Sequence, residues 1–532
     1  MTTSLIVGSG PGAAGAALAL SEDPSQKITV IDIGQQLESD RQEVRAIMAD
    51  QSPSQWNRQD LSQIRTQPSG ERTRGLPQKR SFGSDYPFRN FGQLDSVVGL
   101  DHANDSVVSG AYGGLSNVWG SQIMPFSRET FSTWPVSLAE MEPHYRAILD
   151  EIPFAGNDDA LAERHPLIGT PTPLPQLAPR TTAVLGAFDR SRASLDRKGI
   201  TVGAARLAFE PTPCQRCGLC MTGCPYSLIY SASQTFDRLR AKNQIEYHDN
   251  LLVIEVGQEE DVAFVVARDL STGEHHRFEA DRVFVACGAV GTTRLVLSSL
   301  GVYDQDVDLS ESVQFALPML SRRPTPDPRN DTEFTLNQFN MLIATDKEWM
   351  DVSQIHFYPY NDSVVENLPG LLQSPLAAPI LTQLLRRVTI GLGYLPSWQS
   401  PTMRVKITPP APGRDLAGIV VSGDHWRGFD NPMFRKVAAR LIRAAPQLDL
   451  WPLFPMAIFS APGKSYHFGG SFPHRTASVD GSLTTDRLGR LSPWSRVHMV
   501  DASVFPSVPA TTFTLTIMAN AHRIATETRG MA

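Results

Sequence analysis

The chain is poor in cysteine, in excess charge and in long apolar runs. It has 532 residues, of which 5 are cysteine, and its formal net charge is -7. A sequence without a basic excess or a block of basic residues gives no support for nucleic-acid binding. No apolar run reaches the roughly 18 residues that indicate a membrane-spanning helix. We therefore expect no nucleic-acid partner and no membrane span.

A secretory leader is also missing from the start of the sequence. The first residues, MTTSLIVGSGPG, lead directly into a strand and a tight turn. A leader would need a basic segment, an apolar segment and a cleavage site. We expect a cytoplasmic protein, in which thiols stay reduced. In that compartment a group of cysteines favours metal or redox chemistry over a disulfide.

The beginning of the chain has the order strand, glycine turn, helix, strand. Gly8 and Gly10 open a G-x-G-x-x-A pattern that has Ala13 in its third place. Gly8 would make the tight turn, and Gly10 would let the backbone approach a pyrophosphate. Ala13 and Gly15 are small enough to let the helix and the strand pack closely. Asp32 ends the second strand and could bind ribose hydroxyls, so the pattern predicts a dinucleotide site that prefers FAD or NAD to NADP.

A second glycine-rich segment reads SGAYGGLSNVWGSQIMPF and spans residues 109–126. Gly113 and Gly114 would let the backbone lie against a flat ring or a phosphate, with Ser116 and Asn117 beside them. We interpret these four residues as cofactor-binding.

Three other residues belong to conspicuous segments. We expect Trp119 to pack in the core rather than form a ring wall. Cys287 lies in a strand that leads into a small-residue turn and a helix, and we expect a small buried residue rather than a reactive thiol. Near the end of the chain a strand reaches Asp501, which we place near the ribityl or phosphate part of a flavin. A helix follows from about Thr512, and its positive N-terminus could stabilise reduced flavin.

These segments resemble the glucose–methanol–choline (GMC) oxidoreductases and occur in the order of that family. The matching motifs are LIVGSGPGAAGAALA…VIDIG, GGLSNVWG, WPVSLAEMEPHY, VACGAVGTTRLVL, SYHFGG and VDASVFPSVPATTFTLTIMANAHRIA. The resemblance implies an α/β fold in which a Rossmann-like FAD-binding domain is interleaved with an α+β substrate domain built on an antiparallel sheet. It also implies hydride transfer from an alcohol carbon to flavin N5.

The resemblance gives the domain boundaries. The FAD-binding domain would span 1–304 and return at 461–532, with an excursion at 35–90 and a cysteine loop at 211–227. The excursion is polar and irregular, with a first part that suits a helix, and we assign no chemistry to it. The substrate domain would span 305–460.

Within the predicted substrate domain, four segments read as strands and one as a helix. The strands are EFTLNQFNMLIAT, SQIHFYPYN, TMRVKITPP and LAGIVVSG, and the helix is DNPMFRKVAARLIRAA, with Asp430 or Asn431 as its cap. Several polar side chains could line a pocket for a polyhydroxylated substrate, or lie on the surface of the sheet. They are Gln338, Asn340, His356, Tyr358 and Tyr360.

A histidine is the expected base, because a neutral imidazole can take the hydroxyl proton at neutral pH. His467 in GKSYHFGGSF matches the family's position, and His474 is the alternative. Where the family has a second His or Asn, this chain has Thr511 and Thr512. Thr512 could donate to the substrate oxygen or cap the last helix, and we favour capping. Covalent flavin attachment is not indicated, because the loop beside the ring has Asn117 rather than histidine or cysteine.

Four of the five cysteines, Cys214, Cys217, Cys220 and Cys224, stand within eleven positions. Their spacing, C-x2-C-x2-C-x3-C-P, is that of the bacterial ferredoxin run for iron–sulfur clusters. Three of them also match the C-x5-C-x3-C pattern of the sugar dehydrogenases of this family, and Cys217 is the extra one. A [4Fe–4S] cluster and a [3Fe–4S] cluster are both open, beside structural zinc, a disulfide or an empty loop.

A cluster would give electrons an exit from the flavin. The resemblance and the cysteine run together imply a dehydrogenase that oxidises an alcohol group of a sugar, nucleotide sugar or related polyol and passes electrons to a protein or quinone acceptor. The alternatives are an O2-dependent oxidase with a vestigial cysteine loop, a flavin sugar mutase or isomerase without net redox turnover, and an electron carrier without catalysis.

Overall fold

A computed structural model of the chain describes residues 2–65, 79–89, 97–98, 108–360, 375–424, 428–477 and 481–529. Among the helices in these ranges, none has the length and apolar character needed to cross a membrane.

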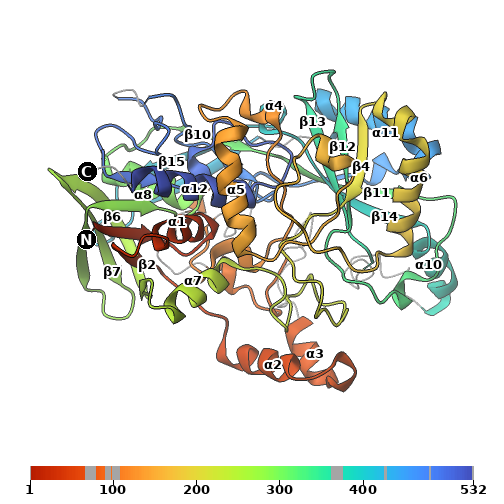
Figure 1. Cartoon of the computed structure of the whole chain (residues 1–532), viewed down its shortest axis with the longest axis horizontal. Coiled ribbons are helices and arrows are strands. Elements are labelled where there is room, and N and C mark those ends of the chain that lie inside the picture. Colours follow the sequence, from red (N-terminus) through yellow and green to blue (C-terminus); the bar gives the residue numbers. More distant parts are fainter. Residues whose placement is uncertain are drawn as a thin grey trace.

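One half of the molecule is built on a parallel sheet. Its strands in spatial order are β20 (Val497–Met499), β9 (Arg282–Val285), β1 (Thr2–Val7), β2 (Gln26–Ile31) and β5 (Glu246–His248), and all neighbours are parallel. In Figure 1 this half also holds α1 (Pro11–Ser21), α5 (Leu138–Glu151), α7 (Ala232–Ala241), α8 (Ala289–Ser299), α12 (Thr514–Thr528) and the meander β6 (Leu251–Glu259), β7 (Val262–Asp269) and β8 (His275–Ala280). The carboxyl ends of the parallel strands meet at one edge, where ligands bind in open α/β sheets.

Two glycines explain how tightly this half is packed. Gly8 has φ of +99°, and a Cβ there would lie 2.7 Å from the carbonyl oxygen of Ala286. A Cβ on Gly15 would lie 2.2 Å from the carbonyl oxygen of Met518, so α1 and α12 touch backbone to backbone. The close approach expected of Ala13 and Gly15 is therefore made by Gly15, between two helices, and Ala13 is an ordinary buried residue.

The other half is built on an antiparallel sheet. Its strands in order are β17 (Trp451–Pro452), β11 (Gln314–Leu320), β14 (Val388–Tyr394), β13 (Val352–Phe357), β12 (Phe339–Ala344) and β4 (Ile200–Ala204), with β18 (Ile458–Phe459) also paired to β11. Helices α6 (Pro179–Asp196), α10 (Ala378–Leu385) and α11 (Pro432–Leu448) lie in this half in Figure 1. As predicted, α11 starts at a capping residue, because the Asn431 side chain accepts the N–H of Phe434 at 3.0 Å.

The sheets depart from the predicted boundaries at two places. Strand β4 and helix α6 precede residue 304, yet β4 pairs with β12 and α6 shares the core of the antiparallel sheet. Strands β15 (Met403–Thr408) and β16 (Gly418–Gly423) fall inside 305–460, yet their buried side chains share a core with the parallel sheet. A third sheet contains them, in the order β19 (Phe468–Gly469), β10 (Val307–Glu311), β15, β16 and β3 (Val97–Val98).

The predicted excursion covers the cysteine loop. It contains α2 (Ser39–Ala49) and α3 (Arg58–Arg65), whereas 66–78 and 90 lie outside the described residues. The Trp56 ring stacks on Tyr226 at 6.0 Å, and the Phe82 N–H donates to the Thr222 carbonyl at 2.7 Å. A short helix, α4 (Arg128–Phe131), precedes α5.

Candidate active site

One cavity of about 1040 Å³ reaches from the parallel sheet to the antiparallel sheet. Gly8, Asp32 and Asp501 line it at the carboxyl ends of the parallel strands, and Tyr394 and His467 line it at the other end. Small-molecule pockets usually measure about 300–1,000 Å³. The cavity therefore has room for a large cofactor together with a small substrate.

At the parallel-sheet end, Asp32 is held by a buried polar network. The hydroxyl of Ser9 donates to its carboxylate, and the Tyr247 hydroxyl donates to the same oxygen at 2.9 Å. The Gly113 N–H in turn donates to Ser9 Oγ at 2.9 Å. Burial raises the pKa of Asp32 to about 6, although both hydroxyl donors oppose this shift. Together with the Gly8 turn and the N-terminus of α1, this arrangement fits the nucleotide of FAD.

The glycine-rich loop is fixed mainly by its own side chains. Ser116 Oγ donates to the Gly113 carbonyl at 2.5 Å and accepts the N–H of Ala232 at 2.9 Å. The Asn117 amide donates to the carbonyls of Tyr112 and Gly114 at 2.9 and 2.8 Å. Gly114 and Ser116 line the cavity, whereas Gly113 and Asn117 do not. The interpretation of Asn117 as a cofactor ligand is therefore corrected, because its amide donors hold the loop.

Three further residues that the sequence singled out line the cavity. Trp119 packs against the core, as expected, and it also lines the cavity, while its Nε1–H donates to the Tyr230 carbonyl at 2.7 Å. Cys287 also lines the cavity, and burial raises the pKa of its thiol, as suits an unreactive residue. The Asp501 carboxylate accepts the Thr292 hydroxyl at 2.5 Å and the Ser503 N–H at 2.9 Å.

His467 stands at the opposite end of the cavity, on the residues that lead into β19. Its ring stacks on Tyr394 at 4.5 Å and meets the edge of Phe513 at 4.9 Å. Its backbone N–H donates to Ser465 Oγ at 3.0 Å, and its carbonyl accepts the Ser312 N–H at 2.8 Å. Nδ1 is buried without a hydrogen-bond partner in the described structure, and burial lowers the pKa of His467 to about 3. The ring is therefore neutral and keeps an unused nitrogen.

His474, the alternative base, has no such freedom. Its Nδ1 lies 2.7 Å from the Asp486 carbonyl, and its Nε2 lies 3.2 Å from the Asn520 amide. Because both ring nitrogens are used inside the protein, His474 has a structural role. The two histidines are thus distinguished by their partners rather than by their burial.

Two other buried polar atoms lack hydrogen-bond partners in the described part of the chain. The His356 ring on β13 packs on the Tyr394 ring, with 5.0 Å between the ring centroids. The buried Nε2 of His356 is unpaired within the described residues. Thr512 Oγ1 is also buried and unpaired there. The prediction that Thr512 caps the last helix was wrong, because α12 begins at Thr514 with Phe513 in the capping position. Thr511 instead donates to Gln354 Oε1 at 2.7 Å.

The five residues predicted to line a substrate pocket differ in whether they bond within the protein or lie at the cavity. Gln338 Oε1 accepts the Ala178 N–H at 2.8 Å and the Thr181 hydroxyl at 2.9 Å, so it ties α6 to the sheet. Asn340 Oδ1 accepts from the Asn337 amide at 2.8 Å. Both are structural. Tyr358 and Tyr360 line the cavity, and His356 lies behind Tyr394.

Comparison with known proteins addresses the fold. No protein-family model matches the sequence, and no curated protein matches it. Among solved structures, pyridoxine 4-oxidase from Mesorbium loti aligns with a TM-score of 0.60 and 14% identity over 99% of each chain. The R554A variant of Aspergillus oryzae RIB40 formate oxidase aligns with a TM-score of 0.60 and 12% identity, over 98% of this chain and 97% of that one. This chain has the fold of these two enzymes.

The mixed α/β fold that the sequence motifs implied is confirmed at the level of the overall fold, and the interleaved arrangement of the two domains stays a prediction. At these identities the similarity concerns the fold alone. Within this fold, the base position implied by the resemblance coincides with His467, the histidine whose ring faces the cavity with an unpaired nitrogen.

The cysteine loop agrees least with what the sequence predicted, which was an iron–sulfur cluster. The Thr335 N–H donates to Cys220 Sγ at 3.4 Å, and burial raises the pKa of Cys217 to about 12 and of Cys224 to about 11. Within the described ranges, which include all of 211–227, no three Cys, His, Asp or Glu side chains are placed to hold a metal ion. The donor chemistry suits iron and sulfur, but this arrangement does not fit a formed cluster.

Two charged groups, one half-buried and one buried, were missed by the sequence interpretation. Lys79 lines the cavity, although it belongs to the excursion to which we assigned no chemistry. Glu311 ends β10 and accepts the Gly463 N–H at 2.9 Å and the Ser465 hydroxyl at 2.7 Å, so it holds the segment that carries His467. Neither residue belongs to a short motif, because its role depends on chain segments far away in the sequence.

Glu311 should make the stability of the protein depend on pH. Burial raises its pKa from 4.5 to about 7, so its contribution to stability is complete below pH 4.5 and is lost as the pH rises through about 7. We expect Glu311→Gln to make the melting temperature less sensitive to pH between about 5 and 8. The exposed Glu274→Gln serves as control. An unchanged pH profile in Glu311→Gln, measured by calorimetry, would contradict the assignment.

Proposed function

We propose that this chain is an FAD-dependent oxidoreductase that oxidises an alcohol group of a sugar, nucleotide sugar or related polyol to a carbonyl. The observation that carries the proposal is the buried and unpaired Nδ1 of His467, which lines one end of the cavity. Leaving such an atom unpaired is unfavourable, so its partner is expected from a substrate.

The other end of the cavity supports FAD as the cofactor. The α1 N-terminus would face the pyrophosphate, Asp32 would bind ribose, and the loop at Gly114 would lie beside the bound group. When bound, the flavin would supply the two-electron acceptor for the hydride that leaves the substrate carbon. The two structural neighbours are both oxidases, which supports the same class of reaction.

His467 would accept the proton of the substrate hydroxyl. Its ring is neutral because burial lowers its pKa to about 3, and the Tyr394 and Phe513 rings fix its plane. A base this weak does not produce a free alkoxide, so we expect the proton to leave the oxygen as hydride leaves the carbon.

The electron acceptor distinguishes two versions of this function. The cysteine spacing supports a dehydrogenase with an iron–sulfur cluster and a protein or quinone acceptor. The thiol arrangement and the oxidase neighbours support the alternative, an oxidase that uses O2. We derive no electron-transfer step through the loop, because the side chains as arranged do not fit a cluster.

The experiment is oxidation of a panel of sugars and polyols by FAD-loaded protein, with carbonyl product measured by mass spectrometry. Dye reduction without peroxide, together with iron in anaerobically purified protein, identifies the dehydrogenase. Peroxide formation in iron-free protein identifies the oxidase. Product formation that needs no acceptor identifies a mutase or isomerase and contradicts net oxidation.

A further inference from the structure

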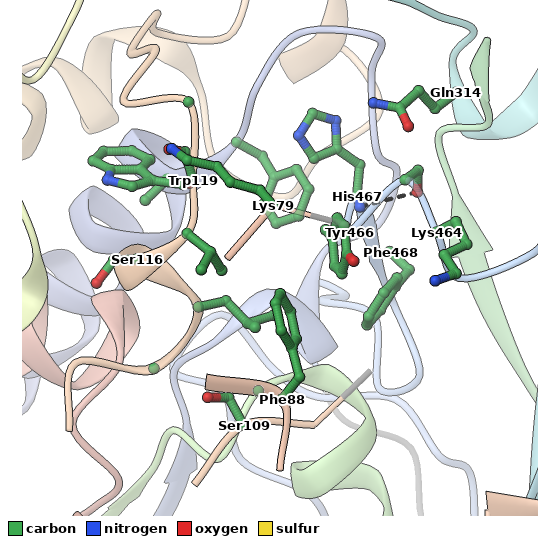
Figure 2. Close-up of a pocket in the computed structure, with 18 of the residues that line it drawn as sticks. Lys79, Phe88, Ser109, Ser116, Trp119, Gln314, Lys464, Tyr466, His467 and Phe468 are labelled. Atoms are coloured by element: carbon green, nitrogen blue, oxygen red, sulfur yellow. Dashed lines mark hydrogen bonds between the residues drawn. The ribbon is translucent and has the colours of Figure 1, made fainter. Parts of the chain in front are cut away.

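Lys79 is a cation in the wall of the cavity, and no described residue gives it an anionic partner. Its Nζ donates to the Trp119 carbonyl at 2.5 Å, and the side chain lines the cavity. Figure 2 shows it extending to Trp119 in the part of the wall that also carries Tyr466 and His467. The side chain is surrounded by protein and exposes surface only partly, as expected for a group that faces an enclosed space.

No carboxylate of the described residues lies within ion-pair distance of Lys79. A neutral carbonyl is a poor substitute for a counter-charge, and burying an unpaired ammonium is unfavourable. Burial accordingly lowers the pKa of Lys79 to about 8, and Cys220 opposes this shift. Among the described residues, Lys79 therefore has no anion on its cavity side.

The other carboxylates in the cavity wall make no ion pair with Lys79 in the described part of the chain. Asp331 lines the cavity without such a pair, and Asp32 and Asp501 lie at the nucleotide end, where both are hydrogen-bonded within the protein. The pyrophosphate of a dinucleotide would lie at the α1 N-terminus, at the same end. His467 and His356 are neutral, because burial lowers the pKa of each to about 3.

We infer that Lys79 forms an anion subsite for the substrate, so that the alcohol this protein oxidises carries a carboxylate or a phosphate. This inference rests on the proposed function. The shared chemistry is a compact anion that accepts a charged hydrogen bond from Nζ. A sugar acid and a phosphorylated or nucleotide sugar both satisfy it, and the choice of probes separates them.

Binding is measured by calorimetry on the FAD-loaded protein, so the result does not require turnover. The probes are glucose, glucuronate and glucose 6-phosphate, which differ in their anionic group. We expect the wild-type protein to bind at least one acidic probe about 10–100-fold more tightly than glucose. Binding of glucuronate alone identifies a carboxylate site, and binding of the phosphate ester alone identifies a phosphate site.

The matched variants are Lys79→Gln, Lys79→Arg and the exposed Lys436→Gln. We expect Lys79→Gln to lose the preference for the acidic probe, Lys79→Arg to keep part of it, and Lys436→Gln to match the wild type. The preference should also decline above about pH 8, as the ammonium loses its proton. If Lys79→Gln does not fold, the wild-type comparison and Lys79→Arg still decide the matter.

Three results would overturn the inference. The first is equal binding of glucose and both acidic probes by the wild-type protein. The second is an acidic preference that survives in Lys79→Gln. The third is a loss of iron in that variant with probe binding unchanged, which would assign Lys79 to the cysteine loop. Absence of carbonyl product with acidic preference intact would instead contradict the proposed function and leave the subsite standing.

Discussion

Replacing His467 with Asn is expected to slow reduction of bound flavin by an alcohol substrate about 10²–10⁴-fold, the usual contribution of a general base. Asparagine fits the space between Tyr394 and Phe513 but cannot take up a proton. The flavin content and melting temperature should change little, because Nδ1 has no hydrogen bond to lose within the described structure. Stopped-flow absorbance under anaerobic conditions measures the rate.

Two histidine variants serve as controls for this result. The exposed His276→Gln should reduce flavin at the wild-type rate. His474→Asn should instead lower the melting temperature, because His474 bonds to Asp486 and Asn520. Flavin reduction in His467→Asn at the wild-type rate would remove His467 from the reaction.

Replacing Asp32 with Asn is expected to weaken FAD binding about 10–100-fold. A hydrogen bond from a ribose hydroxyl to a carboxylate contributes about 1.5–3 kcal/mol, and an amide oxygen is a weaker acceptor. The Ser9 and Tyr247 hydroxyls hold the Asp32 carboxylate in place for this contact. Fluorescence titration of the apoprotein with FAD gives the dissociation constants.

The stability of the apoprotein separates lost binding from lost folding. Because the pKa of Asp32 is raised to about 6, its favourable contribution is present below pH 3.8 and is lost as the pH rises through about 6. At pH 8 the Asp32→Asn apoprotein should therefore melt no lower than the wild type. The exposed Asp261→Asn should leave FAD affinity unchanged. Wild-type affinity in Asp32→Asn would show that the nucleotide binds elsewhere.

The parts that the sequence predicted well depend on short-range patterns. The order β1, turn, α1, β2 follows from apolar runs and from Gly8, whose positive φ is needed at the turn. The cap at Asn431 and the start of α11 follow from neighbouring residues in the same way. His467 could be singled out because two glycines follow it in a motif that resembles a known family.

The parts that failed depend on contacts between distant segments. Thr512 looks like a helix cap in sequence, but the helix begins two residues later, which leaves its hydroxyl unpaired. The Asn117 amide donates to carbonyls of its own loop, a choice that only the loop conformation decides. Lys79 reaches the cavity from an irregular segment, and β4 pairs with β12 from a distant part of the chain, as the register Thr201↔Leu342 and Asn340↔Gly203 shows.

The most direct test of the central claim is the visible spectrum of FAD-loaded protein before and after anaerobic addition of an alcohol panel that includes neutral and acidic sugars. The account predicts tightly bound flavin that loses its oxidised absorption band with at least one alcohol, and that loses it far more slowly in His467→Asn. A protein that binds no flavin, or whose flavin stays oxidised with every alcohol but is reduced by an amine, would contradict it.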